Sequence, residues 1–325
     1  MITRRTVLLS SLAAGATALL RHTDAVHAAA SQPSTPLSFA MPAGACDCHT
    51  HVFGDPQKFP FWSGRTYTPE AASVDETRAM HRALHMDRII VVHPSVYGTD
   101  NSCTLDALRQ LGSRARGVAV IDDKTSDAQL DAMHKAGVRG IRLNFETFGQ
   151  RDPAAALQSF QTAVQRVSGR KWHIQMYTRL SVIEGLQKEI MAAPVPVVID
   201  HFGGAQASLG LGQAGFETLL GLVRAGKAYV KVSAAYNMST ERPDYPDVLP
   251  FAKALIAANP QRIIWGSNWP HPPEAEERAK RPVTDISPLQ RIDDGHMLNL
   301  LSSWAPEPAL RKTILVENPA RLYGF

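Results

Sequence analysis

The chain has 325 residues, of which 44% are hydrophobic and 20% charged, and its formal net charge is +4 at pH 7. This is the composition of an ordinary globular protein, and the length allows a large core that needs neither a disulfide nor a metal to fold. Half of the net charge lies in the first 30 residues, and the remaining +2 is too weak a bias to indicate nucleic acid or an anionic membrane as a partner.

Residues 1–30 have the features of a removable export signal. Arg4 and Arg5 form a twin-arginine pair, an apolar stretch follows over residues 7–20, and small residues at 28–30 suit a cleavage region. A membrane anchor is the alternative, but the apolar stretch is shorter than the roughly 20 residues that a span requires. The pattern therefore predicts a Tat-type signal peptide and a periplasmic or secreted protein, with no membrane attachment after cleavage.

The next segment, residues 31–44, is rich in Ser, Pro, Ala and Gly and predicts a flexible leader. A single domain is expected over residues 45–325. Its three cysteines, Cys46, Cys48 and Cys103, are too few to form a disulfide framework.

Short β-rich runs alternate with amphipathic helical patterns along this domain, and several runs are almost continuously apolar. Such runs are typical of strands covered on both faces of a parallel sheet. Strands are predicted over 45–53, 88–95, 116–121, 138–144, 172–177, 195–201, 228–234 and 262–268. Helices are predicted over 73–86, 102–113, 127–136, 153–168, 180–192, 215–226 and 247–259, and in the tail over 287–323.

Eight strands alternating with helices predict an α/β fold of the (β/α)8 TIM-barrel type. A doubly wound open sheet is the alternative, but the chain has no Gly-rich nucleotide loop of the kind that such sheets often carry. Barrel enzymes hold their sites at the carboxyl ends of the strands, so polar residues at those positions are the candidates for chemistry.

The first strand ends in Asp47-x-His49-x-His51, and strand alternation puts these three side chains on one face. His201 at the end of the sixth strand is expected to face the same cavity. Converging histidines at a barrel mouth can bind a metal or move a proton, whereas a single one often only anchors a loop.

Three motifs together resemble one family. Asp47-x-His49-x-His51, then Asp200-His201-Phe202-Gly203, and finally the run from Trp265 to His271, Trp-Gly-Ser-Asn-Trp-Pro-His, are similar to the amidohydrolase-related branch of the amidohydrolase superfamily. Within that branch the chain resembles the group of lactonases for pyrone dicarboxylates and sulfomuconolactone and of sugar-acid lactone isomerases. The resemblance runs from about Ala45 to Phe325.

The resemblance implies a hydrolase that opens a small lactone or a related carboxylated ring compound. It implies catalytic roles for His49, His51, His201 and Asn268, with the histidines polarising the carbonyl and managing protons. It also implies a substrate pocket lined by Tyr67, Ser95, Thr99, Arg142, Tyr177 and His271. Arg142 is a natural bidentate clamp for a carboxylate, although a salt bridge at the barrel rim is the alternative.

Two departures from the family pattern matter. Most of the superfamily has an aspartate at the position of Asn268, and an amide cannot accept a proton from the attacking water. The loop 234–238 lacks an arginine that the dicarboxylate lactonases use for substrate. Two further hypotheses therefore stay open: a sugar-acid lactone isomerase, which resembles this chain in having asparagine, and an exported binding protein without turnover.

The resemblance also bears on metal. The lactonase and isomerase group works without a metal ion, and the aspartate ligand expected at position 268 is missing. We therefore expect no cofactor, with zinc held by His49, His51 and His201 as the alternative. The expected partner is a small carboxylated lactone, and no nucleic acid.

Overall fold

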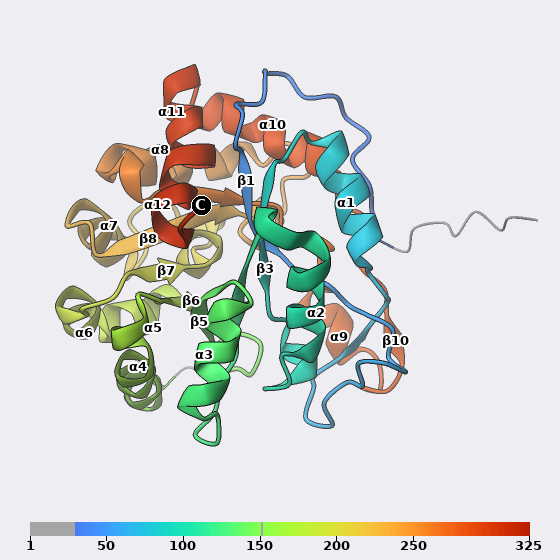
Figure 1. The fold of residues 1–325 in the computed structure, drawn as a ribbon. Helices are drawn as coiled ribbons and strands as arrows, with labels where there is room; N and C mark the ends of the chain where they lie inside the picture. The colour runs from blue at the N-terminus through green and yellow to red at the C-terminus, as the bar shows by residue number, and fades with distance from the viewer. Residues whose placement is uncertain (1–29, 151) are drawn as a thin grey trace, which may run out of the picture.

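A computed structural model describes residues 30–150 and 152–325. Its core is an eight-stranded parallel sheet in the order β1-β3-β4-β5-β6-β7-β8-β9, wrapped into a barrel with helices outside (Figure 1). This confirms the predicted TIM barrel. The strands are β1 Cys46–Thr50, β3 Arg88–Val92, β4 Ala115–Ala119, β5 Val138–Asn144, β6 His173–Tyr177, β7 Val197–Ile199, β8 Ala228–Ser233 and β9 Ile263–Gly266.

The barrel closes between β1 and β9, next to the predicted catalytic residues. The amide of Asn268 donates to the carbonyl of His49 at 2.9 Å, and the amide of His51 donates to the carbonyl of Trp269 at 2.8 Å. Gly266 makes the close approach possible, because a Cβ there would lie 2.7 Å from the Cβ of His49. The seam therefore brings the ends of the first and last barrel strands side by side.

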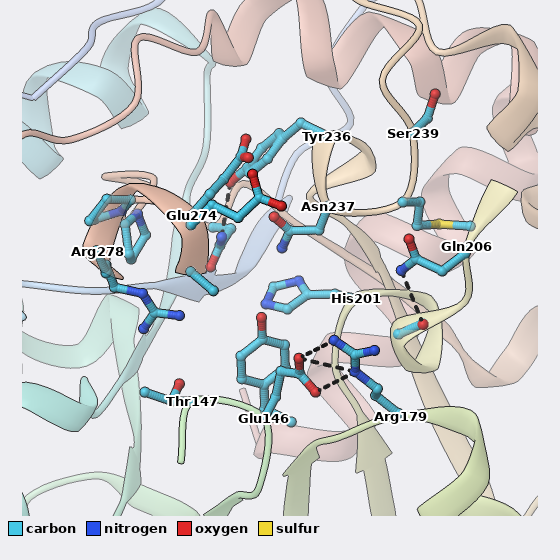
Figure 2. Close-up of a pocket in the computed structure, with 18 of the residues that line it drawn as sticks. Glu146, Thr147, Arg179, His201, Gln206, Tyr236, Asn237, Ser239, Glu274 and Arg278 are labelled. Atoms are coloured by element: carbon cyan, nitrogen blue, oxygen red, sulfur yellow. Dashed lines mark hydrogen bonds and ion pairs between the residues drawn. The ribbon is translucent and has the colours of Figure 1, made fainter. Parts of the chain in front are cut away.

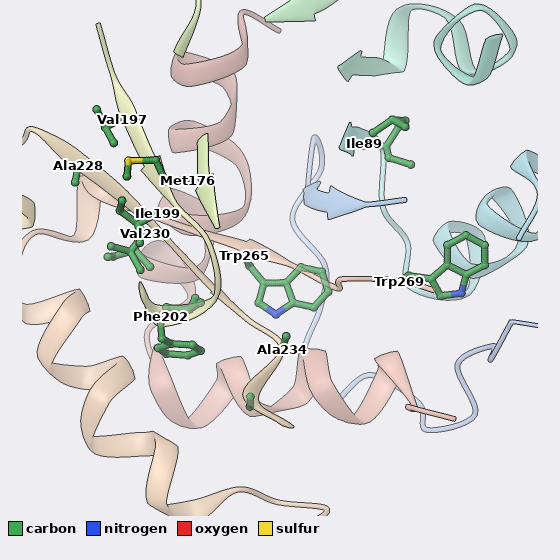
Figure 3. Close-up of a cluster of buried hydrophobic side chains, with 14 of the residues drawn as sticks. Ile89, Met176, Val197, Ile199, Phe202, Ala228, Val230, Ala234, Trp265 and Trp269 are labelled. Carbon is green, nitrogen blue, oxygen red and sulfur yellow. The ribbon is translucent and has the colours of Figure 1, made fainter. Parts of the chain in front are cut away.

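The apolar runs form strands because both of their faces are buried. Outward-facing Val197, Ile199 and Val230 pack together under the helices, and Ile199 and Val230 are register partners (Figure 3). Inward-facing residues form a separate small cluster at the closed end of the barrel, where Cys46, Cys48 and Tyr323 meet. The two cysteines are free and fully buried.

The helices follow the predicted pattern, with capping signals at several starts. Ser73 and Glu76 form a capping box at the first turn of α1. The predicted helix over 180–192 is two short helices, α5 Leu180–Gly185 and α6 Gln187–Ala192. The others around the barrel are α1 Val74–Ala83, α2 Ser102–Leu111, α3 Asp127–Lys135, α4 Pro153–Val167, α7 Phe216–Arg224 and α8 Leu249–Ala258.

The last part of the chain covers the barrel from two sides. The loop after β9 carries α9 Ala275–Ala279 and a short strand β10 Ile286–Ser287, which pairs with β2 Thr68–Pro69 of the first loop. The tail is helical as expected, with α10 Asp294–Trp304, α11 Pro308–Lys312 and α12 Asn318–Tyr323. Among the described residues, no helix has the length and apolarity needed to cross a bilayer.

Residues 31–44 differ from the flexible leader expected from their composition. The segment runs along α10, where the side chains of Ser34 and Thr35 donate to the Asp293 carboxylate at 2.7 and 2.6 Å. Ser38 donates its amide to Asn299 at 2.7 Å. Specific hydrogen bonds thus fix a segment whose composition alone suggested freedom. The predicted signal over residues 1–30 lies outside the described residues, except for Ala30.

Candidate active site

A cavity of about 730 Å³ opens at the carboxyl ends of the barrel strands (Figure 2). Its floor is formed by His51, His201 and Asn268, and Arg142 and Tyr177 come from β5 and β6. The surrounding loops add mostly polar side chains. Of the residues predicted from sequence, those that line this cavity are His51, Tyr67, Ser95, Arg142, Tyr177, His201 and Asn268.

His49 lies directly beneath the floor. Its side chain is fully buried, and its ring centroid is 5.0 Å from that of His51 and 4.6 Å from that of His201. The three predicted histidines therefore converge as a cluster, with His49 as its inner member.

Three predicted placements were wrong. Thr99 is exposed and its hydroxyl lies 3.4 Å from Asp122, outside the cavity wall. His271 is fully buried behind the wall, in contact with Tyr236 and Asp294. Asp47 does not join the histidines, because the strand register shifts between Asp47 and Thr50 and breaks the simple alternation.

Asp47 instead holds the closing seam. Its carboxylate accepts the amides of His49 and Ser267 at 3.1 and 3.0 Å and lies 3.3 Å from His81 of α1. This residue thus positions the backbone on which the site is built, and takes no place in the cavity.

The backbone at the strand ends is strained. His201, Ala234, Asn268 and His271 all have positive φ, between 47° and 64°, in the left-handed region that L-residues other than asparagine, aspartate and glycine rarely adopt. Such conformations persist where the surrounding structure enforces them, and they cluster at functional sites. Of these residues, His201 and Asn268 line the cavity.

A buried charge network supports the cavity floor from below. Lys231, in the middle of β8 and fully buried, donates to Gln175 Oε1 at 2.7 Å and lies 3.2 Å from Asp200 Oδ1. Gln175 in turn donates to Asp200 Oδ2 at 2.9 Å, and Arg142 Nη2 lies 3.5 Å from the same oxygen. One carboxylate therefore pairs with two buried cations, and the three groups together keep one positive charge.

The network also orients the histidines. His49 Nδ1 lies 3.2 Å from Lys231 Nζ and 3.3 Å from Asp200 Oδ1, so a donor and an acceptor both hold the ring and these contacts do not fix its tautomer. The Nδ1 of His51 faces the Val92 carbonyl at 2.8 Å, and a carbonyl can only accept, so Nε2 of His51 carries a free lone pair. His201 Nδ1 contacts the Ser233 hydroxyl at 2.8 Å. The cluster thus offers an acceptor at His51 Nε2.

Burial keeps these imidazoles neutral. It lowers the pKa of His51 to about 3 and that of His201 to about 4, with Arg142 lowering both further. Burial and the Lys231 ammonium lower the pKa of His49 well below its ordinary value. Burial alone would raise the pKa of Asp200, but Lys231 holds it well below the usual range. The site at neutral pH is therefore an ionised carboxylate beneath three neutral rings.

Arg142 supplies a positive charge to the cavity. Its guanidinium stacks 5.2 Å from the centroid of the Tyr177 ring, and its Nε is buried with no hydrogen-bond partner among the described residues. An unpaired buried donor on a cation is a natural place for a substrate carboxylate. Arg142 also lies 3.5 Å from Asp200, and this contact is buried beneath the cavity and not at the barrel rim.

The donor atoms and charges of the histidine cluster show whether a metal ion would fit there. Donor atoms of His49, Asp200 and His201 lie within 4.8 Å of one another, so the distances admit a cation. This set has Asp200 in the place where the sequence alternative had His51. The charges do not fit, because Asp200 already pairs with the buried cations Lys231 and Arg142, whose positive charges would repel a metal ion beside that carboxylate.

Several residues of the site were missed from sequence. Lys231 had a visible signal, since it is the one charged residue in the apolar run from Ala228 to Ser233. Tyr236 lines the cavity, and its hydroxyl contacts Asn268 and His271. No sequence pattern marks a tyrosine in a loop as a site residue. Arg179, paired with Glu146 at 2.9 Å, and Arg278, 5.3 Å from the Tyr67 ring, reach the cavity from separate loops (Figure 2).

The chain is similar to a known protein family and to several of its members. The model of the amidohydrolase family matches residues 46–325. The chain is 36% identical over 296 residues to the 4-sulfomuconolactone hydrolase of Rhizobium radiobacter, covering 90% of this chain and 93% of that protein. It is 34% identical over 304 residues to the 2-pyrone-4,6-dicarbaxylate hydrolase of Comamonas testosteroni, with coverage of 90% and 93%. It is 26% identical over 287 residues to the D-galactarolactone isomerase of Agrobacterium fabrum, with coverage of 87% and 92%.

Solved structures share the fold. An apo structure from Agrobacterium tumefaciens superposes with a TM-score of 0.75 at 24% identity, covering 89% of this chain and 98% of that one. A zinc-bound amidohydrolase from Burkholderia multivorans superposes with a TM-score of 0.62 at 19% identity, covering 87% and 100%. At these identities the likeness concerns the barrel and not its chemistry.

Proposed function

The chain belongs to the amidohydrolase family, and on that premise we propose that it is a lactonase-like hydrolase that opens a small carboxylated lactone. The observation that carries the proposal is the cavity, which the imidazoles of His51 and His201 and the amide of Asn268 line together with the Arg142 guanidinium. The named relatives that act on lactones by hydrolysis support the same reaction class.

In this proposal the Arg142 guanidinium binds the substrate carboxylate and fixes the ring over the histidines. With Nδ1 of His201 accepting from the Ser233 hydroxyl, its Nε2–H donates to the carbonyl oxygen, where negative charge develops as a nucleophile adds. Asn268 orients the attacking oxygen. Donors aimed at the developing oxyanion lower the barrier because they interact more strongly with the transition state than with the substrate.

Lactone isomerisation is the second candidate, and Asn268 is the observation that favours it. Without a carboxylate base, a substrate hydroxyl held by the amide could attack its own lactone carbonyl, with the benefit of proximity. The isomerase of Agrobacterium fabrum is a relative at 26% identity.

Turnover in water labelled with ¹⁸O separates the candidates. We expect a panel of carboxylated lactones to include a substrate whose product carries one label in the new carboxylate. A changed ring size without label would favour isomerisation. If the wild-type protein binds lactones but converts none of them, while Asn268→Asp gains hydrolysis, the exported binding protein is the better description.

We further propose that the reaction needs no metal, because Lys231 and Arg142 already supply the positive charge around Asp200. Protein purified without chelators should contain far less than one equivalent of zinc by elemental analysis. Lactone turnover should be the same before and after treatment with a chelator. Stoichiometric zinc, together with activity that chelation removes and zinc restores, would contradict this proposal.

Export through a twin-arginine signal is a proposal that rests on residues 1–30 alone. Replacing Arg4 and Arg5 together by lysine should leave the full-length precursor in the cytoplasm, because the paired guanidinium groups are the recognised feature. Cell fractionation and the mass of the purified protein measure this. A processed periplasmic product from the lysine variant would argue against the twin-arginine route.

A further inference from the structure

A chain of buried polar groups leads from the cavity into the protein behind it. Asn268 Nδ2 is 2.9 Å from the Tyr236 hydroxyl, which is 2.9 Å from His271 Nδ1. His271 Nε2 is 3.0 Å from Asp294 Oδ2. Asn268 and Tyr236 line the cavity, whereas His271 and Asp294 are fully buried in the barrel wall and at the start of α10.

The direction of each hydrogen bond follows from its end group. A carboxylate only accepts hydrogen bonds, so Nε2 of His271 carries a proton and donates it in a hydrogen bond to Asp294. Nδ1 of His271 is then left as an acceptor. Tyr236 therefore donates its hydroxyl hydrogen to His271, and its oxygen accepts from the Asn268 amide nitrogen. One lone pair of the Tyr236 oxygen remains for a group in the cavity, and the Asn268 carbonyl oxygen is free to face the same space.

We propose that Tyr236 is a catalytic residue that, with His271 and Asp294 acting through it, accepts the proton of the attacking water in place of the missing aspartate. The proposal rests on the lactone chemistry proposed above. It gives a reason why Asn268 is compatible with hydrolysis: the basic group lies one step further from the cavity and is reached through a hydroxyl.

The step balances without another reactant. Water oxygen adds to the lactone carbonyl carbon, its proton passes to the Tyr236 oxygen, and the Tyr236 hydroxyl hydrogen passes to His271 Nδ1. The imidazolium formed is neutralised by Asp294. When the tetrahedral intermediate collapses, the ring carbon–oxygen bond breaks, and the proton returns along the same path to the leaving alkoxide oxygen. The net change is the addition of one water.

The surroundings suit this arrangement. Burial raises the pKa of Asp294 above its ordinary value, which makes it a stronger proton acceptor than an exposed aspartate. The backbone of both Asn268 and His271 is held at a φ of 64°, so the turn that carries them is built at a conformational cost.

A rescue experiment tests the relay directly. Tyr236→Phe should lower kcat for lactone hydrolysis by about 10²- to 10⁴-fold, the usual contribution of a general base, with KM changed little. Adding Asn268→Asp to that variant should recover at least tenfold of the loss, because the carboxylate receives the proton directly. Tyr229→Phe is the matched control, since it also removes a buried hydroxyl with a partner, Arg262, at the far end of the barrel.

A purely structural role for Tyr236 would not produce the rescue. An unchanged kcat in Tyr236→Phe, or a double variant no faster than the single one, would overturn the relay. Wild-type protein that converts no lactone would instead count against the proposed function. The relay could then still be tested through the protonation of His271, which requires no substrate.

The protonation of His271 gives that substrate-free readout. In ¹⁵N-labelled protein, with the signals of His271 identified from His271→Gln, we expect the proton on Nε2 and an acceptor at Nδ1. Asp294→Asn should reverse this, because an amide can donate to Nε2 and shift the proton to Nδ1, and kcat should fall with it. A proton on Nδ1 of His271 in the wild-type protein would refute the proposed direction of the relay.

Discussion

Replacing His201 by asparagine should lower kcat for lactone opening by about 10²- to 10⁴-fold, because the variant loses a positioned imidazole at the cavity floor. Asparagine is the informative replacement, since the φ of His201 is 47° and asparagine tolerates the left-handed region better than alanine does. The folded structure should therefore persist while the imidazole is lost. Steady-state kinetics on the best lactone of the panel, with circular dichroism of both proteins, measures the effect.

His85→Asn is the matched control for this variant. His85 also has a positive φ, 53°, but its side chain is exposed at the end of α1, away from the cavity. This control should keep the wild-type kcat. Equal activity in His201→Asn and His85→Asn would remove His201 from the proposed chemistry.

The second large effect concerns stability. Lys231→Met should reduce the free energy of unfolding by about 3–5 kcal/mol, the range for removing one partner of a buried ion pair. The variant keeps a side chain of similar length and leaves the fully buried Asp200 carboxylate with only the more distant Arg142 as a cation. Urea unfolding followed by fluorescence gives the difference.

Two further variants test whether the unpaired Asp200 charge causes the loss of stability. Lys253→Met removes an exposed lysine of α8 and should change the free energy of unfolding by less than about 0.5 kcal/mol. Asp200→Asn added to Lys231→Met should restore part of the lost stability, because the unpaired charge is gone. A double variant less stable than Lys231→Met would show that the cost comes from packing around the lysine and not from the charge.

The barrel and several residues of the candidate site could be predicted from local patterns in the chain. Apolar runs such as that from Arg88 to Val92 can only be buried on both faces, which fixes a parallel sheet. The polar residues at the strand ends then had to meet at one mouth, and His51, His201, Arg142 and Asn268 do so. These inferences depend on the local periodicity of apolar and polar residues, which can be read directly from the sequence.

The pairing of the polar residues, by contrast, depends on the folded arrangement of the chain. The register shift in β1 separates Asp47 from the histidines, and the periodicity of apolar residues in the sequence does not predict such a shift. Asp294 lies 23 residues beyond His271 in the chain, and Lys231 lies 182 beyond His49, yet each pair is in hydrogen-bond contact. Such contacts arise where barrel closure and the docking of α10 bring distant segments together. Tautomers, charge pairing and the path of a proton depend on those contacts, so the chemistry became visible only in the folded chain.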